Sequence, residues 1–121
     1  LELSSSEESL MRIRWIAILY GRIDCSLAIT GGVHNAKDVL KALLAGADVT
    51  HMCSALLRRG PGHLAMVLKS LADWMEEHEY ESVQQLKGSV SQANATDSAA
   101  FLRSNYMRVL DSYQPPPGVR W

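Results

Sequence analysis

The feature that most constrains the fold is a pair of strand-like runs joined by a glycine turn and one helix. The first run, Cys25 to Thr30, is apolar with little polar alternation, which is typical of a parallel strand buried on both faces. Gly31 and Gly32 follow it, then a helix from about Asn35 to Gly46, then a second run from Ala47 to Met52. This order predicts two parallel strands with a helical crossover between them.

Helical patterns lie on both sides of this pair of strands. A helix before the first strand can start with a capping box of Ser4 and Glu7, or with one of Ser5 and Glu8. A long helix follows the second strand. The apolar positions that we expect to face the core are Leu10, Ile13, Ile16, Ala17, Tyr20, Val39, Leu40, Leu43, Leu44, Leu64, Val67, Leu68, Leu71, Trp74 and Met75.

The chain divides into three predicted parts. Gly88 closes a short capped turn of helix, so we interpret residues 1–88 as one unit. The small, polar residues 89–96 indicate a linker. Residues 97–121 form the last part, with a helix from about Asp97 to Tyr113 followed by a proline-rich tail.

Two strands alone do not make a complete sheet. A two-stranded parallel sheet has two free edges, and the helices available cannot cover both of its faces. The sequence therefore predicts an incomplete α/β fold, and we expect the missing part to precede Leu1.

Composition narrows the classes of partner. The 121 residues carry a formal net charge of -1 without a sustained run of like charges, so we expect no nucleic acid partner. No apolar segment approaches the roughly 20 residues that span a bilayer, so we expect no membrane partner. The first six residues lack the basic start and apolar run of a secretory signal, which favours a cytoplasmic location.

The two cysteines are predicted to be free thiols. Cys25 lies at the beginning of the first strand run and Cys53 at the far end of the second. In parallel neighbours they are separated by most of a strand at ~3.3 Å per residue, which is beyond the reach of a disulfide.

Two turns at the carboxyl ends of the strands are candidates for binding a phosphate. Gly31 and Gly32 leave the backbone open to close approach, and Cys53 and Ser54 open the next turn, where a short helix begins. Backbone N–H groups from two such turns, at the same edge of a parallel pair, make a place for an anion. Arg58 and Arg59 either reach toward that anion or lie in a solvated loop.

The same residues could also serve as metal ligands or as a nucleophile. His51 and Cys53 alternate along one strand and His34 is near in sequence, but a metal site needs a third or fourth ligand, so none is assigned. Cys53 at a helix start can be an activated thiol, yet no neighbouring base is assured. A histidine satisfied by hydrogen bonds is the simpler interpretation.

Several stretches resemble the dihydroorotate dehydrogenase family. They are residues 29–33 (Ile-Thr-Gly-Gly-Val), residues 47–56 (Ala-Asp-Val-Thr-His-Met-Cys-Ser-Ala-Leu), residues 59–61 (Arg-Gly-Pro), and the long helix with residues 79–83 (Glu-Tyr-Glu-Ser-Val) up to Gly88. The likeness covers about residues 10–88. Residues 14–19 and the C-terminal extension resemble a subgroup usually labelled dihydroorotate dehydrogenase-like.

The resemblance implies a fold, a cofactor and a reaction. Members of the family are FMN-binding (β/α)₈ barrels, and this chain would supply the last part, from helix six to helix eight, with a C-terminal helical extension. Gly31, Gly32, Cys53 and Ser54 would bind the FMN phosphate. The implied reaction is that of an FMN-dependent oxidoreductase, the oxidation of dihydroorotate to orotate in pyrimidine biosynthesis. The family's catalytic base precedes this part, so no residue here is assigned a catalytic role. The implied partners are a small-molecule substrate such as dihydroorotate and further copies in a homo-oligomer.

Two other interpretations remain open. Another phosphate-binding barrel, such as an FMN-dependent 2-hydroxy acid oxidase or a sugar-phosphate enzyme, would carry the same turns, because one barrel hosts many chemistries. Alternatively, the chain is a helix-rich interaction module in which residues 97–121 bind a partner.

Overall fold

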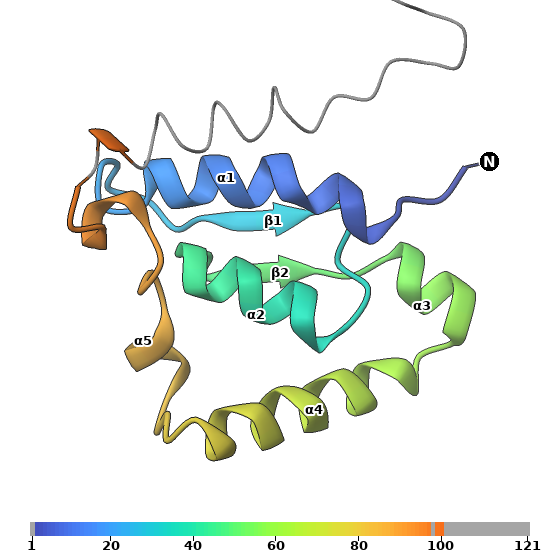
Figure 1. Cartoon of the computed structure of the whole chain (residues 1–121). Coiled ribbons are helices and arrows are strands. Elements are labelled where there is room, and N and C mark those ends of the chain that lie inside the picture. Colours follow the sequence, from blue (N-terminus) through green and yellow to red (C-terminus); the bar gives the residue numbers. More distant parts are fainter. Residues whose placement is uncertain (1, 98, 101–121) are drawn as a thin grey trace, which may run out of the picture.

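A computed structural model describes residues 2–97, 99 and 100 of the chain (Figure 1). The described elements are, in order, η1 (Ser6–Glu8), α1 (Ser9–Leu19), β1 (Ala28–Thr30), α2 (Ala36–Ala45), β2 (Val49–His51), α3 (Ser54–Arg59), α4 (His63–Glu77), α5 (Val83–Leu86) and η2 (Gln92–Asn94). The predicted order of strand, helix and strand is confirmed. The helix predicted from Asp97 to Tyr113 lies almost entirely outside the described residues.

The two strands pair in parallel and form a small sheet. Ala28 pairs with Val49, and Thr30 pairs with His51. Both strands are shorter than the predicted runs, because the Asp48 side chain ends the ladder at its amino end. The Asp48 carboxylate accepts the backbone N–H of Leu27 at 2.8 Å, so the strand cannot extend toward Cys25.

Most of the predicted helix ends are confirmed in detail. The Asn35 side chain accepts the backbone N–H of Asp38 at 3.0 Å and begins α2, and Gly46 ends it. Of the two capping boxes weighed for the first helix, the one with Ser5 is formed, because Glu8 accepts the Ser5 backbone N–H at 2.8 Å. Local side-chain acceptors thus set where these helices begin.

The hydrophobic core lies on one side of the sheet, between the strands and the helices. Ile29 of β1 is buried there among residues of three helices, listed here by element: Ile16 and Ala17 of α1; Val39, Ala42 and Leu43 of α2; Val67 and Leu71 of α4. Figure 1 shows α1 and α2 running alongside the two strands, with α4 beyond α2. These helices bury one face of the small sheet.

The other face of the sheet is open. Ala28, Thr30, Val49 and His51 are exposed, and Val49 retains 48% of its full surface. Because paired residues of parallel strands share a face, these four side chains form one uncovered surface. The expectation of strands buried on both faces is therefore wrong for the described residues, whereas the expected lack of cover on one face is confirmed.

Three residues predicted to be in the core are exposed instead. They are Leu10 of α1, and Leu64 and Leu68 of α4, with exposed fractions of 58%, 44% and 57%. The reason is geometric. A broad apolar stripe needs neighbours across its whole width, and among the described residues the elements that contact α1 and α4 leave these three side chains exposed.

The amino end of the sheet is closed by side-chain packing and an ion pair. The Tyr20 ring lies so close to Gly46 and Gly88 that a Cβ built on either glycine would be 2.3 Å from it. The Lys87 ammonium donates to the Asp48 carboxylate at 2.6 Å. This bond, followed by the backbone N–H of Leu27, lowers the pKa of the Asp48 carboxyl below its ordinary value.

Residues 89–96, interpreted as a linker, lie against this end of the molecule. The backbone N–H of Val90 donates to the Leu44 carbonyl at 3.0 Å, and Ser91 and Gln92 are buried. The segment contains η2, which contacts α1. The segment therefore packs on the unit before it. The division at this segment stays a prediction, because the part beyond it lies outside the described residues.

Within the described part of the chain, no helix is both long and apolar enough to cross a bilayer.

Candidate functional site

The carboxyl ends of both strands open onto one cavity of about 220 Å³. In Figure 1 both strands point toward the side where α3 and the N-terminal segment lie. The residues that line the cavity are Ser4, Thr30, Gly31, Gly32, Val33, His51, Cys53 and Ser54. The structure thus brings all four of the residues predicted to bind phosphate, Gly31, Gly32, Cys53 and Ser54, to the same place.

Polar groups from three separate segments meet at the Ser4 hydroxyl. It accepts the backbone N–H of Gly32 at 3.2 Å and donates to the Ser54 hydroxyl at 2.9 Å. The His34 imidazole Nε2 lies 3.4 Å from the same oxygen. One oxygen atom therefore lies at the focus of a backbone amide, a hydroxyl and an imidazole.

The His34 turn that carries two of these groups is fixed by buried polar residues. Asp38, only 4% exposed, accepts the His34 backbone N–H at 3.0 Å and the Ser6 hydroxyl at 2.7 Å. The His63 imidazole Nε2 donates to the His34 carbonyl at 2.7 Å from α4. A carbonyl only accepts, so the hydrogen must lie on this nitrogen. Hydrogen bonds from α2 and α4 thus hold the turn, and Ser6 of η1 in turn binds Asp38.

The two glycines of the turn play different parts. Both have positive φ values, 81° at Gly31 and 80° at Gly32, which L side chains rarely adopt. A Cβ on Gly32 would lie 2.5 Å from the Ser9 backbone nitrogen, whereas a Cβ on Gly31 would meet only the Arg12 guanidinium at 3.2 Å. Gly32 is therefore required by close backbone packing, and Gly31 chiefly by its conformation.

Two arginines lie beside the cavity without lining it. The Arg12 guanidinium packs over Gly31, and Arg12 also donates to the Glu8 carbonyl. The Arg58 guanidinium donates to the Leu3 carbonyl at 3.0 Å. Of the two interpretations of Arg58, reaching toward the anion or lying in a solvated loop, the structure shows a third arrangement. The Arg58 side chain binds the backbone of the residue before Ser4.

The structure also places the cysteines and histidines that are candidates for other chemistry. Both cysteines are free, as predicted, and both are exposed. His51 and Cys53 line the cavity together, but the described residues contain no group of three or more His, Cys, Asp or Glu side chains that could hold a metal ion.

Ser4 is the site residue that sequence reasoning missed. The sequence indicates only a helix-capping role for Ser4, and in the structure Ser5 caps the helix instead. The available signal was the run Ser4-Ser5-Ser6, since a single cap leaves the other two hydroxyls without a role. Ser6 bonds Asp38, and Ser4 is the one that reaches the cavity.

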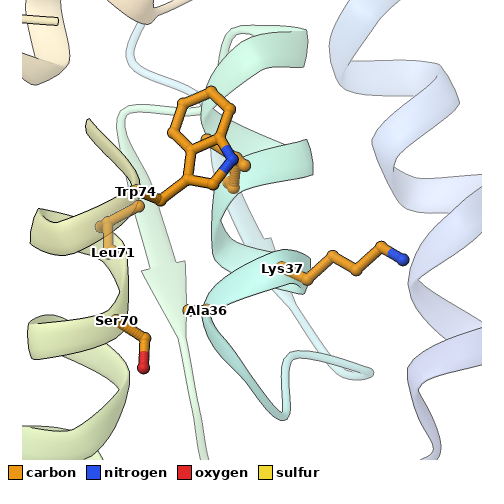
Figure 2. A pocket seen from close by; sticks show the side chains of 6 residues that line it. Ala36, Lys37, Ser70, Leu71 and Trp74 are labelled. Atoms are coloured by element: carbon orange, nitrogen blue, oxygen red, sulfur yellow. The ribbon is translucent and has the colours of Figure 1, made fainter. Parts of the chain in front are cut away.

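Two other cavities have fewer polar groups that are available to bind a ligand. One of about 290 Å³ lies between α2 and α4 and is largely apolar; Figure 2 shows Trp74 extending across it while the Lys37 side chain points away from α4. Another of about 500 Å³ lies at the amino end of the sheet, but Asp48 and Lys87 there are paired with each other. The carboxyl-end cavity is therefore the best candidate site.

Comparison with known proteins identifies relatives of the chain, although no family model matches it. It is 28% identical over 65 residues to dihydropyrimidine dehydrogenase (NADP(+)), chloroplastic, of Arabidopsis thaliana, which is 54% of this chain and 15% of that protein. It is 32% identical over 76 residues to dihydroorotate dehydrogenase (quinone) of Allorhizobium ampelinum, 61% of this chain and 21% of that protein. The Chelativorans dihydroorotate dehydrogenase (quinone) is 32% identical over 59 residues, 49% and 16% respectively.

The three relatives belong to one class of enzyme. All three are dehydrogenases, and two of them are dihydroorotate dehydrogenases. The resemblance to dihydroorotate dehydrogenases that the sequence motifs indicate is therefore confirmed. The matched region spans between 15% and 21% of the length of these relatives, so the chain is similar to a minor part of each.

Proposed function

We propose that the chain is part of a flavin-dependent oxidoreductase resembling dihydroorotate dehydrogenase, and that this part supplies the binding site for the FMN phosphate. The observation that carries the proposal is the convergence of Gly32, Ser54 and His34 on one oxygen position, at the carboxyl ends of two parallel strands. Ligands of α/β proteins bind at this edge of the sheet.

The groups present at the cavity fit a phosphate. The Gly32 amide donates a hydrogen bond, and the Ser54 hydroxyl can rotate to donate one as well. The His34 imidazole donates from Nε2 in the appropriate tautomer. Three donors around one oxygen position, with Gly31 and Cys53 lining the same cavity, suit an anionic oxygen better than a neutral group.

The open face of the sheet agrees with membership of a larger barrel. In a (β/α)₈ barrel, helices cover the outside of each strand while alternate side chains fill the interior. Ile29 faces the helices here, while its neighbours Ala28 and Thr30 face the uncovered side with Val49. Strands from the rest of a barrel would cover that side.

FMN, when bound, would accept the hydride that leaves the substrate, as flavins do. The described residues contribute binding and orientation. Gly32 and Ser54 would fix the phosphate, and the buried Asp38 would hold the His34 turn in place for it. Residues outside this chain would transfer the proton. The substrate would be a dihydropyrimidine such as dihydroorotate.

The cavity by itself would also accept another phosphate monoester, so an FMN-dependent 2-hydroxy acid oxidase or a sugar-phosphate enzyme would present the same groups. The names of the relatives favour the dihydroorotate dehydrogenase class. The alternative of an interaction module depends on residues 97–121, most of which lie outside the described residues.

An absorption spectrum of the full-length protein, purified without added cofactor and then mixed anaerobically with dihydroorotate, tests the proposal. We expect the bands of bound oxidised flavin, and we expect them to bleach on addition of dihydroorotate. Flavin bands that do not bleach would refute the substrate and keep the cofactor. A protein without flavin that also fails to bind added FMN would refute the proposed function.

A further inference from the structure

We propose that residues 101–113 pack along the outer face of α1, the face that carries Met11, Trp15 and Ile18. The occupant of this face is thus a segment of the same chain. The inference goes beyond the proposed function, because these three residues do not line the carboxyl-end cavity. It gives the C-terminal part of the chain an intramolecular role, in place of binding to another molecule.

α1 is apolar around most of its circumference. Ile16 and Ala17 face the core and are only 6% and 5% exposed, whereas Met11 and Trp15, about one turn apart, keep 67% and 56% of their full surface. Ile18 follows Trp15 by three residues and lies on the same side of the helix. A helix that is apolar on all sides is typically buried on all sides. The outer face of α1 therefore calls for a cover.

The outer face is also hollowed, with a cavity of about 380 Å³. The residues that line the cavity are Glu8, Met11, Arg12 and Trp15. Met66 of α4 is a useful contrast, because it is also 67% exposed but shares its side of the helix with the ion pair of Lys69 and Asp73. One exposed methionine on a polar face is ordinary, whereas large apolar side chains grouped around a hollow mark a contact surface.

The chain enters the proposed occupant at the carboxyl end of α1. η2 contacts α1, and Arg22, just beyond α1, donates to the Gln92 side chain at 3.0 Å. Shortly after η2, the Asp97 carboxylate accepts the backbone N–H groups of Ala99 and Ala100 at 3.0 and 2.9 Å. These are the hydrogen bonds of a helix N-cap. A helix therefore begins at Asp97, soon after the chain has passed the carboxyl end of α1.

The sequence from residue 97 to residue 113 has the length and the pattern to cover α1. Its apolar positions recur three and four residues apart on one face of the predicted helix, and they are Leu102, Tyr106, Val109, Leu110 and Tyr113. At about 1.5 Å per residue, a helix over residues 97–113 is about 25 Å long and α1 about 16 Å. A helix that starts at the carboxyl end of α1 and runs back along it would therefore reach the amino end of α1.

The remainder of a barrel would not cover this face. In a (β/α)₈ barrel the helices form an outer ring, with the strands on their inner side and other helices on their flanks. Ile16 and Ala17 of α1 pack in the core with Ile29 of β1, so they mark the inner side of α1. Met11 and Trp15 lie on the side turned away from that core, where a further layer is required.

Hydroxyl-radical labelling of the full-length protein, read by mass spectrometry, measures the exposure of each methionine. Met11 and Met66 are equally exposed within the described part of the chain. Because methionine oxidation follows exposure, we expect Met11 to react about fivefold more slowly than Met66 when residues 101–113 cover it. Tyr106→Asp places a charge in the middle of the apolar stripe, so it should raise the Met11 rate to that of Met66.

A matched variant controls for the added charge. Ser104→Asp adds the same carboxylate on the opposite side of the predicted helix, so it should leave Met11 protected. The Met66 rate should be the same in the wild type and in both variants, which shows that the rest of the fold is intact. The comparison of Met11 with Met66 in the wild type needs no variant, so the test does not depend on the folding of either one.

Three results would overturn the inference. Equal rates for Met11 and Met66 in the wild type would mean that the outer face of α1 is uncovered. Protection of Met11 that persists in Tyr106→Asp would mean that a different segment or another protein covers it. Protection that is lost on dilution of the wild type would assign the face to a second copy of the chain. None of these readings involves flavin, so a failure of the proposed function is seen separately.

Discussion

Glycines and polar side chains lie at both ends of the small sheet, but the two ends differ in what these residues do. At the amino end, the charges of Asp48 and Lys87 neutralise each other and the Tyr20 ring fills the space between two glycines. At the carboxyl end, polar groups surround a cavity and meet at one hydroxyl, that of Ser4. The comparison indicates that the amino end stabilises the fold while the carboxyl end remains available to a ligand, a division typical of α/β proteins.

The largest expected effect is on the closed amino end. Gly46→Ala should destabilise the protein by about 3 kcal/mol, because the new methyl group would clash with the Tyr20 ring in a backbone conformation that alanine disfavours. Urea unfolding measures it. Gly60→Ala is the control, since Gly60 has a φ of 80° but open space around its Cβ, and should lose only about 1 kcal/mol. Equal losses in the two variants would contradict the close packing of Tyr20.

The second prediction concerns the carboxyl end. Gly32→Ala should weaken FMN binding by more than about tenfold, because relieving the clash with the Ser9 backbone moves the amide at the focus of the cavity. Gly31→Ala should weaken it less, since only the flexible Arg12 side chain has to move. Fluorescence titration with FMN gives both values. A larger loss in Gly31→Ala would show that the assignment of the two glycines is reversed.

A smaller effect is expected for a single hydroxyl of the site. Ser54→Ala should raise the Kd of FMN about fivefold, because it removes one hydrogen bond to the phosphate, while the Kd of riboflavin stays the same. An unchanged or lower Kd of FMN in Ser54→Ala would argue against a binding role for Ser54.

The smallest effect is expected at the ion pair. Asp48→Asn should lower the free energy of unfolding by less than about 1 kcal/mol at pH 7, because the pair is partly exposed to solvent. The folded pKa of Asp48 is lowered, so its contribution is present above the unfolded value and disappears as the pH falls through the folded one. The unfolding free energies of the two proteins, measured in urea, should therefore begin to converge as the pH falls below about 4 and meet only below the lowered pKa of Asp48. A difference that persists at low pH would mean that packing, and not charge, sets the effect.

The elements that follow local rules could be predicted from the sequence. Asn35 and Gly46 mark the ends of α2, and the glycine turn after β1 was expected because local chemistry sets these features. The burial of Leu64 and Leu68 was predicted wrongly, since an apolar stripe tells which face is apolar but not whether a neighbour covers it. The strand lengths were also overestimated, because the bond from Leu27 to the Asp48 side chain is a contact between distant residues.

The sequence by itself determined the parallel pair of strands, the crossover helix and the two turns that face a common cavity, because hydrophobic periodicity and glycine placement act within a few residues. The tertiary structure alone decided that Ser4 reaches this cavity. Ser4 meets Gly32 and Ser54 across 28 and 50 residues of chain, and such contacts depend on how α1 packs against the sheet and α2. No local sequence pattern predicts contacts between residues so far apart in the chain. The position of the Ser4 hydroxyl in the cavity is therefore known only from the folded structure.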